Sequence, residues 1–205
     1  MSQPICHMTH ICNLPVILSQ GGIWCDRQAK ERGLTQQGIG HGNIKERRLR
    51  WPVECSPGGF LCDYVPFYFH HHSPMLYVIY RGGVEGYEGG QGEVIYLTSS
   101  TDILAANDLP FVFTDGHAAM ALTEQYQDLS DLSKLDWPVI RANQWTNTNA
   151  DGDRTRRKQA EFLAHNFVPW SMITGIVVRS QTMADQVAAH LHGQPYVPET
   201  QVLLA

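Results

Sequence analysis

The chain from Arg157 to Leu163 reads RKQAEFL and passes abruptly from charged to apolar side chains. The apolar end predicts a strand that begins at Glu161. In an extended chain Gln159 and Glu161 project to the same side. A carboxylate in this place suits a sugar-handling site, because it can accept a hydrogen bond from a ribose hydroxyl and stabilise the positive charge that develops as a glycosidic bond breaks. Taken alone, the Q-x-E triplet is a weak signal and is more typical of a surface glutamate at the start of a strand or helix.

Short apolar runs on both sides of this strand predict a sheet. They are rich in β-branched and aromatic residues and are bounded by glycine, proline and polar residues. The expected strands are 5–9, 64–80, 93–97, 111–113, 161–163, 173–179 and 201–204. Helices are fewer and shorter, so the sequence indicates an α+β protein.

Four helices are expected. One follows an N-cap at Asn13 and stops at Gly21-Gly22, and one short basic helix covers 43–50 within a long loop from Asp26 to Gly59. A third is anchored by Leu129, Leu132, Leu135 and Trp137. A fourth has Met183, Val187 and Leu191 on one face.

Composition fits one domain over residues 1–205, since 43% of the residues are apolar. No run of about 18 apolar residues and no signal-peptide pattern is present, so we expect a cytoplasmic protein without a membrane span. The five cysteines are odd in number and form no C-x-x-C pair, which indicates reduced thiols.

The charge distribution leaves nucleic-acid binding open. A net charge of −5 argues against it, yet eight of the fifteen basic residues fall in two short runs. These residues are Lys45, Arg47, Arg48, Arg50, Arg154, Arg156, Arg157 and Lys158. If the runs meet in space they form a basic stripe, and otherwise they are two solvated faces.

The histidines suggest a sugar or amide site more than a metal site. His7 and Thr9 share one face of the first strand and can bind hydroxyls and an amide, although His7 also suits a half-buried core position. Adjacent histidines in 70–72 alternate sides of an extended chain and cannot all reach one ion, so no metal is expected. Phosphate-binding and nucleotide-binding glycine motifs are absent from the sequence.

The sequence resembles the DarT toxins, which are DNA ADP-ribosyltransferases of the DarT–DarG toxin–antitoxin pairs. The resemblance runs in consistent order from about residue 5 to 180. Its segments are HMTHICNL at 7–14, IKERR at 44–48, PGGFLCDYVPFYF at 57–69, SPMLY at 73–77, GGQ at 89–91, FVFTD at 111–115 and RKQAEFL at 157–163.

This resemblance implies an ADP-ribosyltransferase-like split β-sandwich with short helices, in which NAD binds in the cleft between two sheets. It implies that Glu161 and Arg48 are catalytic and that residues 118–160 form a long target-recognition loop. The NAD-binding residues it implies are His7, Met8, Thr9, Val16, Trp24, Arg48 and Tyr68. The DNA-binding residues are expected to be Lys45, Arg47, Arg154, Arg157 and His117.

The leading hypothesis is therefore a toxin that uses NAD to ADP-ribosylate a base in single-stranded DNA, releasing nicotinamide and blocking replication. Thymidine N3 is the base atom that the resemblance favours. Arg48 either stabilises the resulting anion or assists proton removal. The resemblance also implies a macrodomain antitoxin of the DarG type as partner. Alternatives are an ADP-ribosyltransferase acting on protein, a non-catalytic NAD or nucleic-acid binding module, and a metal-dependent nuclease.

Overall fold

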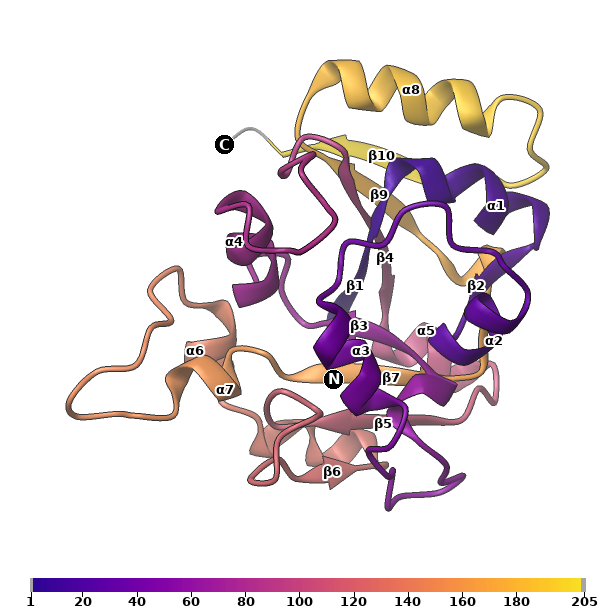
Figure 1. The fold of residues 1–205 in the computed structure, drawn as a ribbon. Coiled ribbons are helices and arrows are strands. Elements are labelled where there is room, and N and C mark those ends of the chain that lie inside the picture. The colour runs from indigo at the N-terminus through magenta and orange to yellow at the C-terminus, as the bar shows by residue number, and fades with distance from the viewer. Residues whose placement is uncertain (1, 204–205) are drawn as a thin grey trace.

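A computed structural model describes residues 2–203, and its strands form an eight-stranded sheet with a separate two-stranded sheet (Figure 1). The order in the large sheet is β10-β9-β4-β1-β3-β7-β5-β6, and β2 pairs with β8. The strands are β1 Pro4–His10, β2 Gly22–Trp24, β3 Tyr64–Tyr68, β4 Val94–Ser100, β5 Phe111–Thr114, β6 Gln125–Tyr126, β7 Glu161–His165, β8 Phe167–Pro169, β9 Gly175–Val178 and β10 Glu199–Val202.

The large sheet is nearly divided in two between β1 and β3. These strands share a single register pair, Cys6 with Tyr68, whereas β1 pairs with β4 along its whole length from Pro4 to His10. Beyond the shared pair the two strands separate, so the sheet opens into a half that contains β10-β9-β4-β1 and a half that contains β3-β7-β5-β6. The expected α+β class is confirmed, and only β3 separates the first strand from the Glu161 strand in the sheet order.

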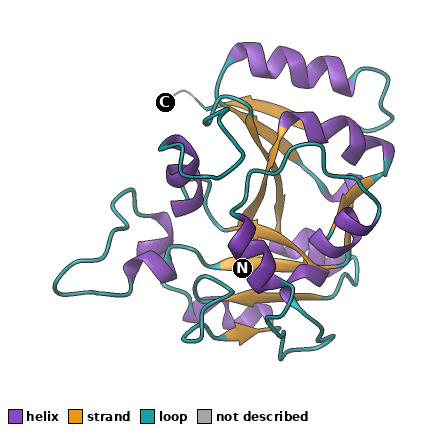
Figure 2. Cartoon of the chain, in the orientation of Figure 1, coloured by secondary structure: helices purple, strands orange, loops and turns teal. Residues whose placement is uncertain are grey.

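Short helices surround these sheets (Figure 2). The α-helices are α1 Leu14–Ser19, α2 Asp26–Glu31, α3 Gly42–Arg48, α4 Pro74–Tyr80, α5 Thr101–Ala106, α6 Trp137–Arg141, α7 Arg154–Arg157 and α8 Gln181–Leu191. The 3-10 helices are η1 Ile11–Asn13, η2 Leu61–Asp63, η3 Leu129–Lys134 and η4 Trp170–Met172. In α8 the buried residues are Met183, Val187 and Leu191, as their spacing predicts.

The expected strand over 64–80 is wrong in its second half. The strand ends at Tyr68, and residues 74–80 form α4. The Ser73 side chain accepts a hydrogen bond from the backbone N–H of Leu76 at 3.2 Å, and Pro74 occupies the first helical turn. This N-terminal cap and proline favour a helix strongly enough to override the β-propensity of the aromatic residues that follow.

The expected loop over 26–59 contains a second helix, α2, in addition to α3. Asp26 lies in the first turn of α2 and Lys30 in its last turn, so both charges complement the helix dipole. At the C-terminal end, β10 spans Glu199–Val202 and pairs in parallel with β9. The predicted strand over 201–204 is thus displaced toward the N-terminus, and Leu204 lies outside the described residues.

Aromatic residues fill the core around β3, β5 and β7. Tyr64, Phe67, Phe113 and Phe162 are each fully buried, and Phe162 also lies at 4.9 Å from Phe111, ring centroid to ring centroid. Burial of such large apolar side chains supplies most of the free energy that holds the two sheet halves in place. Within residues 2–203, no helix combines the length and apolar character required to cross a membrane.

Gly22 allows the two strands of the small sheet to approach each other closely. Its φ of +157° and its position opposite Pro169 bring β2 so near to β8 that a methyl group would overlap the Val168 carbonyl oxygen and the Phe167 ring. Replacement by alanine should therefore lower the free energy of unfolding by about 1–3 kcal/mol, as measured by urea denaturation.

Gly42→Ala is the matched control, because an added methyl group at Gly42 meets no atom within 4 Å. It should leave stability unchanged or raise it by up to about 1 kcal/mol. Equal effects of the two substitutions would show that close approach at Gly22 is not required.

Candidate active site

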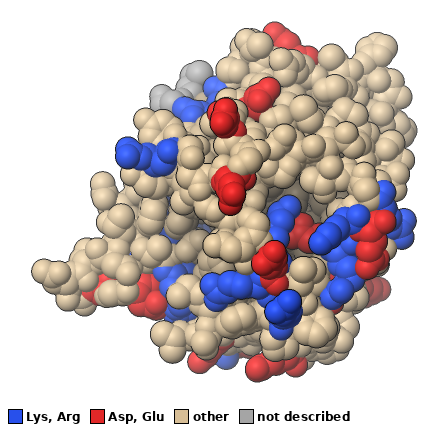
Figure 3. All heavy atoms as spheres, viewed as in Figure 1, with Lys and Arg blue, Asp and Glu red and all other residues tan. Residues whose placement is uncertain are grey.

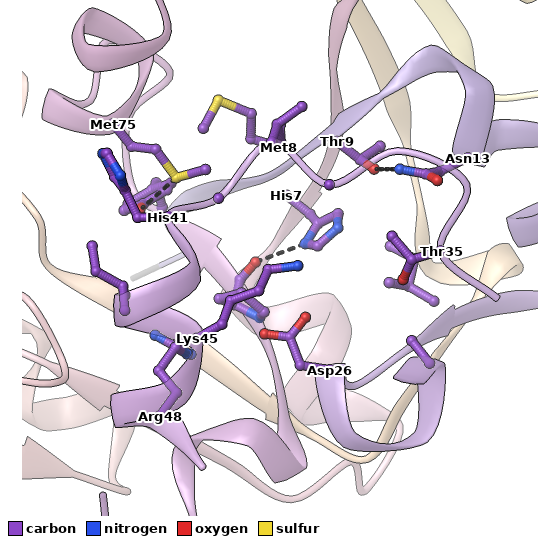
Figure 4. Close-up of a pocket in the computed structure, with 18 of the residues that line it drawn as sticks. His7, Met8, Thr9, Asn13, Asp26, Thr35, His41, Lys45, Arg48 and Met75 are labelled. Carbon is purple, nitrogen blue, oxygen red and sulfur yellow. Dashed lines mark hydrogen bonds between the residues drawn. The ribbon is translucent and has the colours of Figure 1, made fainter. Parts of the chain in front are cut away.

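The opening between the sheet halves contains a cavity of about 470 Å³ (Figure 4). On the outer surface, Figure 3 shows lysine, arginine and acidic side chains gathered around a hollow near the centre of the view. The site residues expected from the sequence that line the cavity are His7, Met8, Thr9, Val16, Trp24, Lys45, Arg48, Tyr68, His117 and Glu161. Arg47, Arg154 and Arg157 are not part of this lining.

Glu161 and Arg48 form a buried ion pair in the cavity wall. Arg48 Nη1 donates to Glu161 Oε2 at 2.8 Å, and only 7% and 3% of the two side chains are exposed. The other carboxylate oxygen, Oε1, accepts from the backbone N–H of Ala118 at 3.0 Å. The backbone N–H of Glu161 donates to the Thr114 hydroxyl at 3.1 Å. The carboxylate is thus fixed by charge and by backbone geometry together.

Arg48 also has unused hydrogen-bonding capacity. Its Nε and Nη2 atoms are buried and have no hydrogen-bond partner among the described residues. Burial opposes the charge on Arg48, but the Glu161 carboxylate outweighs it and raises the pKa of the guanidinium. Buried donors without a partner are costly, so a permanently charged group with spare donors in a cavity wall points to a ligand oxygen as the missing acceptor.

Trp24 provides a third donor of the same kind. Its indole Nε1 is buried without a partner in the described part of the chain, and the residue lines the cavity. The indole is held by the Phe167 ring at 4.4 Å and by the Arg32 guanidinium at 4.0 Å from its centroid. The wall therefore offers fixed donors at two separate places.

His7 and Tyr68 contribute neutral groups. The His7 Nδ1–H donates to the Pro66 carbonyl at 2.9 Å, which leaves Nε2 as a free acceptor, and burial lowers the pKa of His7. Tyr68 lies directly opposite Glu161 in the β3–β7 register, and burial raises the pKa of its hydroxyl. Both groups therefore stay uncharged near neutral pH, which suits hydrogen bonding to an amide or a hydroxyl.

His117 lies beside the carboxylate on the β5 side of the cavity. Its Nδ1 accepts from the backbone N–H of Ala119 at 3.1 Å, so the ring proton of the neutral form is on Nε2. Burial lowers the pKa of His117. The backbone N–H of Ala118 binds Glu161, and the backbone N–H of the next residue, Ala119, binds His117. The same short turn therefore orients the imidazole and the carboxylate.

Asn13 occupies the N-cap position of α1 predicted for it, but its side chain binds elsewhere. Its side chain makes no capping hydrogen bond in α1. Instead Oδ1 accepts from the backbone N–H groups of Gln36 and Gln37 at 2.8 and 3.1 Å, while Nδ2 donates to the Gln37 carbonyl at 2.8 Å and to the Thr9 hydroxyl at 3.1 Å. Asn13 thus fixes the loop 34–41, which supplies part of the cavity wall.

Other wall residues are absent from the sequence-based expectations. Asp26 projects into the cavity toward His7 and Lys45 in Figure 4. Trp145 and Thr155 line it from the far side. The sequence contains no signal for Asp26 until α2 is known, since an acidic residue at the start of an unrecognised helix resembles any surface aspartate.

The second basic run, residues 154–158, mostly binds partners within the protein. This differs from both expectations from the sequence, a basic stripe and a solvated face. Arg156 is buried and binds Asp115 and Asp153, each at 2.8 Å, and Arg157 pairs with Asp136 and Asp151. Lys158 Nζ donates to the carbonyls of Ile140 and Ala142 at 2.7 and 2.8 Å. Burial lowers the pKa of Lys158 to about 8. These basic residues, which directly precede β7, thus hold the segment 115–153 against the start of that strand.

The described residues contain no candidate metal-binding site. No group of three or more histidine, cysteine, aspartate or glutamate side chains within residues 2–203 is placed to hold an ion. In the histidine run 70–72, the rings of His70 and His71 stack at 4.6 Å.

The Asn13 hydrogen bonds should control opening of the loop 34–41. Asn13→Ala removes all four, each of which contributes about 0.5–1.5 kcal/mol, so amide hydrogen exchange in 34–41 should accelerate at least about tenfold. Amides of β1 and β4 should be unaffected. Asn107→Ala, which removes a single hydrogen bond to Ile103 on the surface, is the control. Unchanged exchange in 34–41 would show that packing alone fixes the loop.

Comparison with known proteins identifies the family. Residues 6–203 match the family model described as ssDNA thymidine ADP-ribosyltransferase, DarT. A protein of Thermus sp. (strain 2.9), named DNA ADP-ribosyl transferase, is 41% identical over 202 residues, which cover 98% of this chain and 93% of that protein.

Solved structures agree with this match. The structure of Thermus sp. 2.9 DarT in complex with ADP-ribosylated ssDNA has a TM-score of 0.92 and 39% identity, covering 98% of this chain and 94% of that one. The complex of Thermus sp. 2.9 DarT with NAD+ has a TM-score of 0.88 and 37% identity, with coverage of 98% and 95%. The fold is ADP-ribosyltransferase-like, as the sequence resemblance implied, and the chain belongs to the DarT family.

Proposed function

We propose that this protein transfers ADP-ribose from NAD to thymidine in single-stranded DNA. The observation that carries the proposal is the buried Glu161–Arg48 pair in the wall of an open cavity, with Arg48 Nε and Nη2 left without partners among the described residues. Family membership and the similarity to DarT bound to NAD+ and to ADP-ribosylated ssDNA support the same reaction. A further expectation, a single transferase domain over residues 1–205, is part of this proposal.

The cavity residues suit NAD as the co-substrate. NAD supplies the ADP-ribose group: the bond from its ribose carbon to nicotinamide breaks, and the electron pair of that bond leaves with nicotinamide. The His7 Nε2 acceptor, together with Met8 and Thr9 on the same strand, would bind the nicotinamide end. Tyr68, Val16 and Trp24 would enclose it, and Glu161 would accept from a ribose hydroxyl while its charge opposes the positive charge on the sugar.

Arg48 is proposed to act on the DNA base. Thymine N3 loses its proton to solvent and forms the new bond to the ribose carbon, and negative charge develops on the adjacent carbonyl oxygens as proton loss runs ahead of bond formation. The spare Arg48 donors are suited to that charge. Because the neighbouring carboxylate raises the pKa of Arg48, we assign it electrostatic stabilisation in preference to proton removal.

A single strand is the suitable DNA form, since N3 is hidden in a base pair and extracting a base from a duplex costs a few kcal/mol. Lys45, Arg47, Arg154, Arg157 and His117 are proposed DNA contacts. By its family, the protein is proposed to act as a toxin that blocks replication and to pair with a macrodomain antitoxin of the DarG type. The cytoplasmic location expected from the sequence stays a prediction.

Replacing Glu161 with glutamine tests the reaction and the residue together. The substitution keeps the shape of the side chain and removes the charge, so the rate of adduct formation should fall at least about 100-fold. The measurement is the mass of a thymine-containing single-stranded oligonucleotide after incubation with NAD. Glu85→Gln, which removes an exposed carboxylate that does not line the cavity, is the matched control and should keep the parental rate.

An adduct formed equally well by Glu161→Gln would exclude Glu161 as the stabilising charge. If the parent consumes NAD but no oligonucleotide gains mass, the target is protein, and labelled NAD should then modify total cell protein. Release of nicotinamide by the parent also separates an enzyme from a module that only binds NAD.

The salt dependence of DNA binding tests the phosphate contacts. Lys45 is exposed at the cavity edge, and its ammonium has no ion-pair partner among residues 2–203. Lys45→Ala should therefore weaken DNA binding and reduce the slope of log K against log salt concentration by about one. Arg157 is already paired with Asp136 and Asp151, so Arg157→Ala should change the slope less.

Binding of NAD, measured in parallel, separates a DNA role of Lys45 from a role in holding the NAD phosphates. A full unit of slope lost in Arg157→Ala and none in Lys45→Ala would reverse the proposed roles of the two residues.

A further inference from the structure

Two large aromatic side chains on α4 are exposed on the surface and are not part of the hydrophobic core. Tyr77 and Tyr80 are 49% and 64% exposed, and their hydroxyls make no hydrogen bond within the described chain. Because they are three residues apart on one helix they share a face, with ring centroids 6.4 Å apart and planes at 41°. The opposite side of α4 contributes Met75 and Val78 to the cavity wall.

Trp145 extends this aromatic surface into the cavity. Its ring packs edge-on against Tyr77 at 5.8 Å with an interplanar angle of 74°, and the residue also lines the cavity. We call Tyr77, Tyr80 and Trp145 the aromatic platform. One end of the platform is thus part of the wall that contains Glu161, and the other end lies on the outer surface.

The Trp145 end of the platform is held in place by α7, the helix that leads into the catalytic strand. The backbone N–H of Thr155 donates to Asn147 Oδ1 at 2.8 Å and its hydroxyl contacts the Trp145 carbonyl at 3.5 Å. Arg154 donates to the Gln144 carbonyl at 2.6 Å. The loop between α6 and α7, which projects from the body of the molecule in Figure 1, is therefore anchored at the residues around Trp145.

We propose that the aromatic platform stacks a nucleobase that neighbours the target base in the single strand. This inference rests on the proposed function and deepens it. A target base that enters the cavity leaves its neighbour without a stacking partner, and an exposed aromatic ring at the cavity edge replaces that partner. Stacking on aromatic rings changes affinity by roughly 5- to 100-fold per base and tolerates every base, because each has a π-face.

The geometry favours DNA over a protein as occupant of the platform. Because Trp145 belongs both to the platform and to the cavity wall, the occupant has one segment in the cavity and the next segment on the rings. The strand that carries the target base fulfils both conditions. Exposed aromatic rings without hydrogen-bonded hydroxyls also suit stacking on a flat base.

The test compares Tyr77→Ser/Tyr80→Ser with Tyr77→Phe/Tyr80→Phe. Fluorescence anisotropy with a labelled single-stranded oligonucleotide that contains one thymine measures Kd. The serine variant should raise the Kd by about 10-fold or more, whereas the phenylalanine variant, which keeps the rings, should match the parent. The Kd for NAD should be the same in all three proteins, because neither tyrosine lines the cavity.

Two further oligonucleotides, each with an abasic linker in place of the base on one side of the thymine, complete a double-mutant cycle between protein and DNA. On one side, the linker should weaken binding to the parent by a factor similar to that of the serine substitution and should have little further effect on the serine variant. That non-additivity identifies the stacked neighbour.

Failure of this inference is distinguishable from failure of the proposed function. If the parent modifies the oligonucleotide and the serine variant has the parental Kd, or if linker and substitution effects are additive on both sides, the platform does not stack a base. If the parent neither binds nor modifies any oligonucleotide, the proposed function and this inference both fall.

Discussion

The ion pair between Arg48 and Glu161 is the interaction on which the site depends. Removing two charges from water is costly, and the cost is offset only when geometry and further hydrogen bonds are good. Here α3 supplies the arginine, β7 the carboxylate, and the turn after β5 the Ala118 N–H that completes the carboxylate's partners. These three elements lie far apart in the sequence, so the pair forms only when the sheet is assembled. The Nε and Nη2 atoms of Arg48, which lines the cavity, have no hydrogen-bond partner among residues 2–203.

Two further sets of contacts hold the walls around this pair. Asn13 binds the loop 34–41 to β1 through four hydrogen bonds. On the other side, Arg156, Arg157 and Lys158 bind carboxylates and carbonyls of the segment 115–153. The first set shapes the region where NAD is proposed to bind, and the second shapes the region proposed to contact DNA. The basic residues 156–158 resemble a DNA-binding run but bind internal partners. The proposed phosphate contacts are therefore expected mainly from residues such as Lys45.

Local sequence patterns predict those parts of the structure that local forces determine. The strand beginning at Glu161 and the buried face of α8 are confirmed, because periodicity alone identifies them. The helix α4 is missed because a single cap, Ser73, outweighs the strand propensity of its neighbours. The N-cap position of Asn13 is confirmed, but its side-chain partners, Gln36 and Gln37, are distant in sequence and are not predicted. No spacing rule pairs Arg48 with Glu161, and resemblance to a family is what brings them together before the structure is known.

The central claim is that the cavity directs ADP-ribose to a ring nitrogen of thymine. The most direct measurement compares two single-stranded oligonucleotides, identical except that one carries thymine and the other N3-methylthymine, after incubation of each with the protein and NAD. Mass spectrometry should detect one ADP-ribose on the thymine strand and none on the methylated strand, since the methyl group occupies the attacking atom. An adduct of equal yield on both strands would contradict this claim and would place the modification on another atom of the DNA.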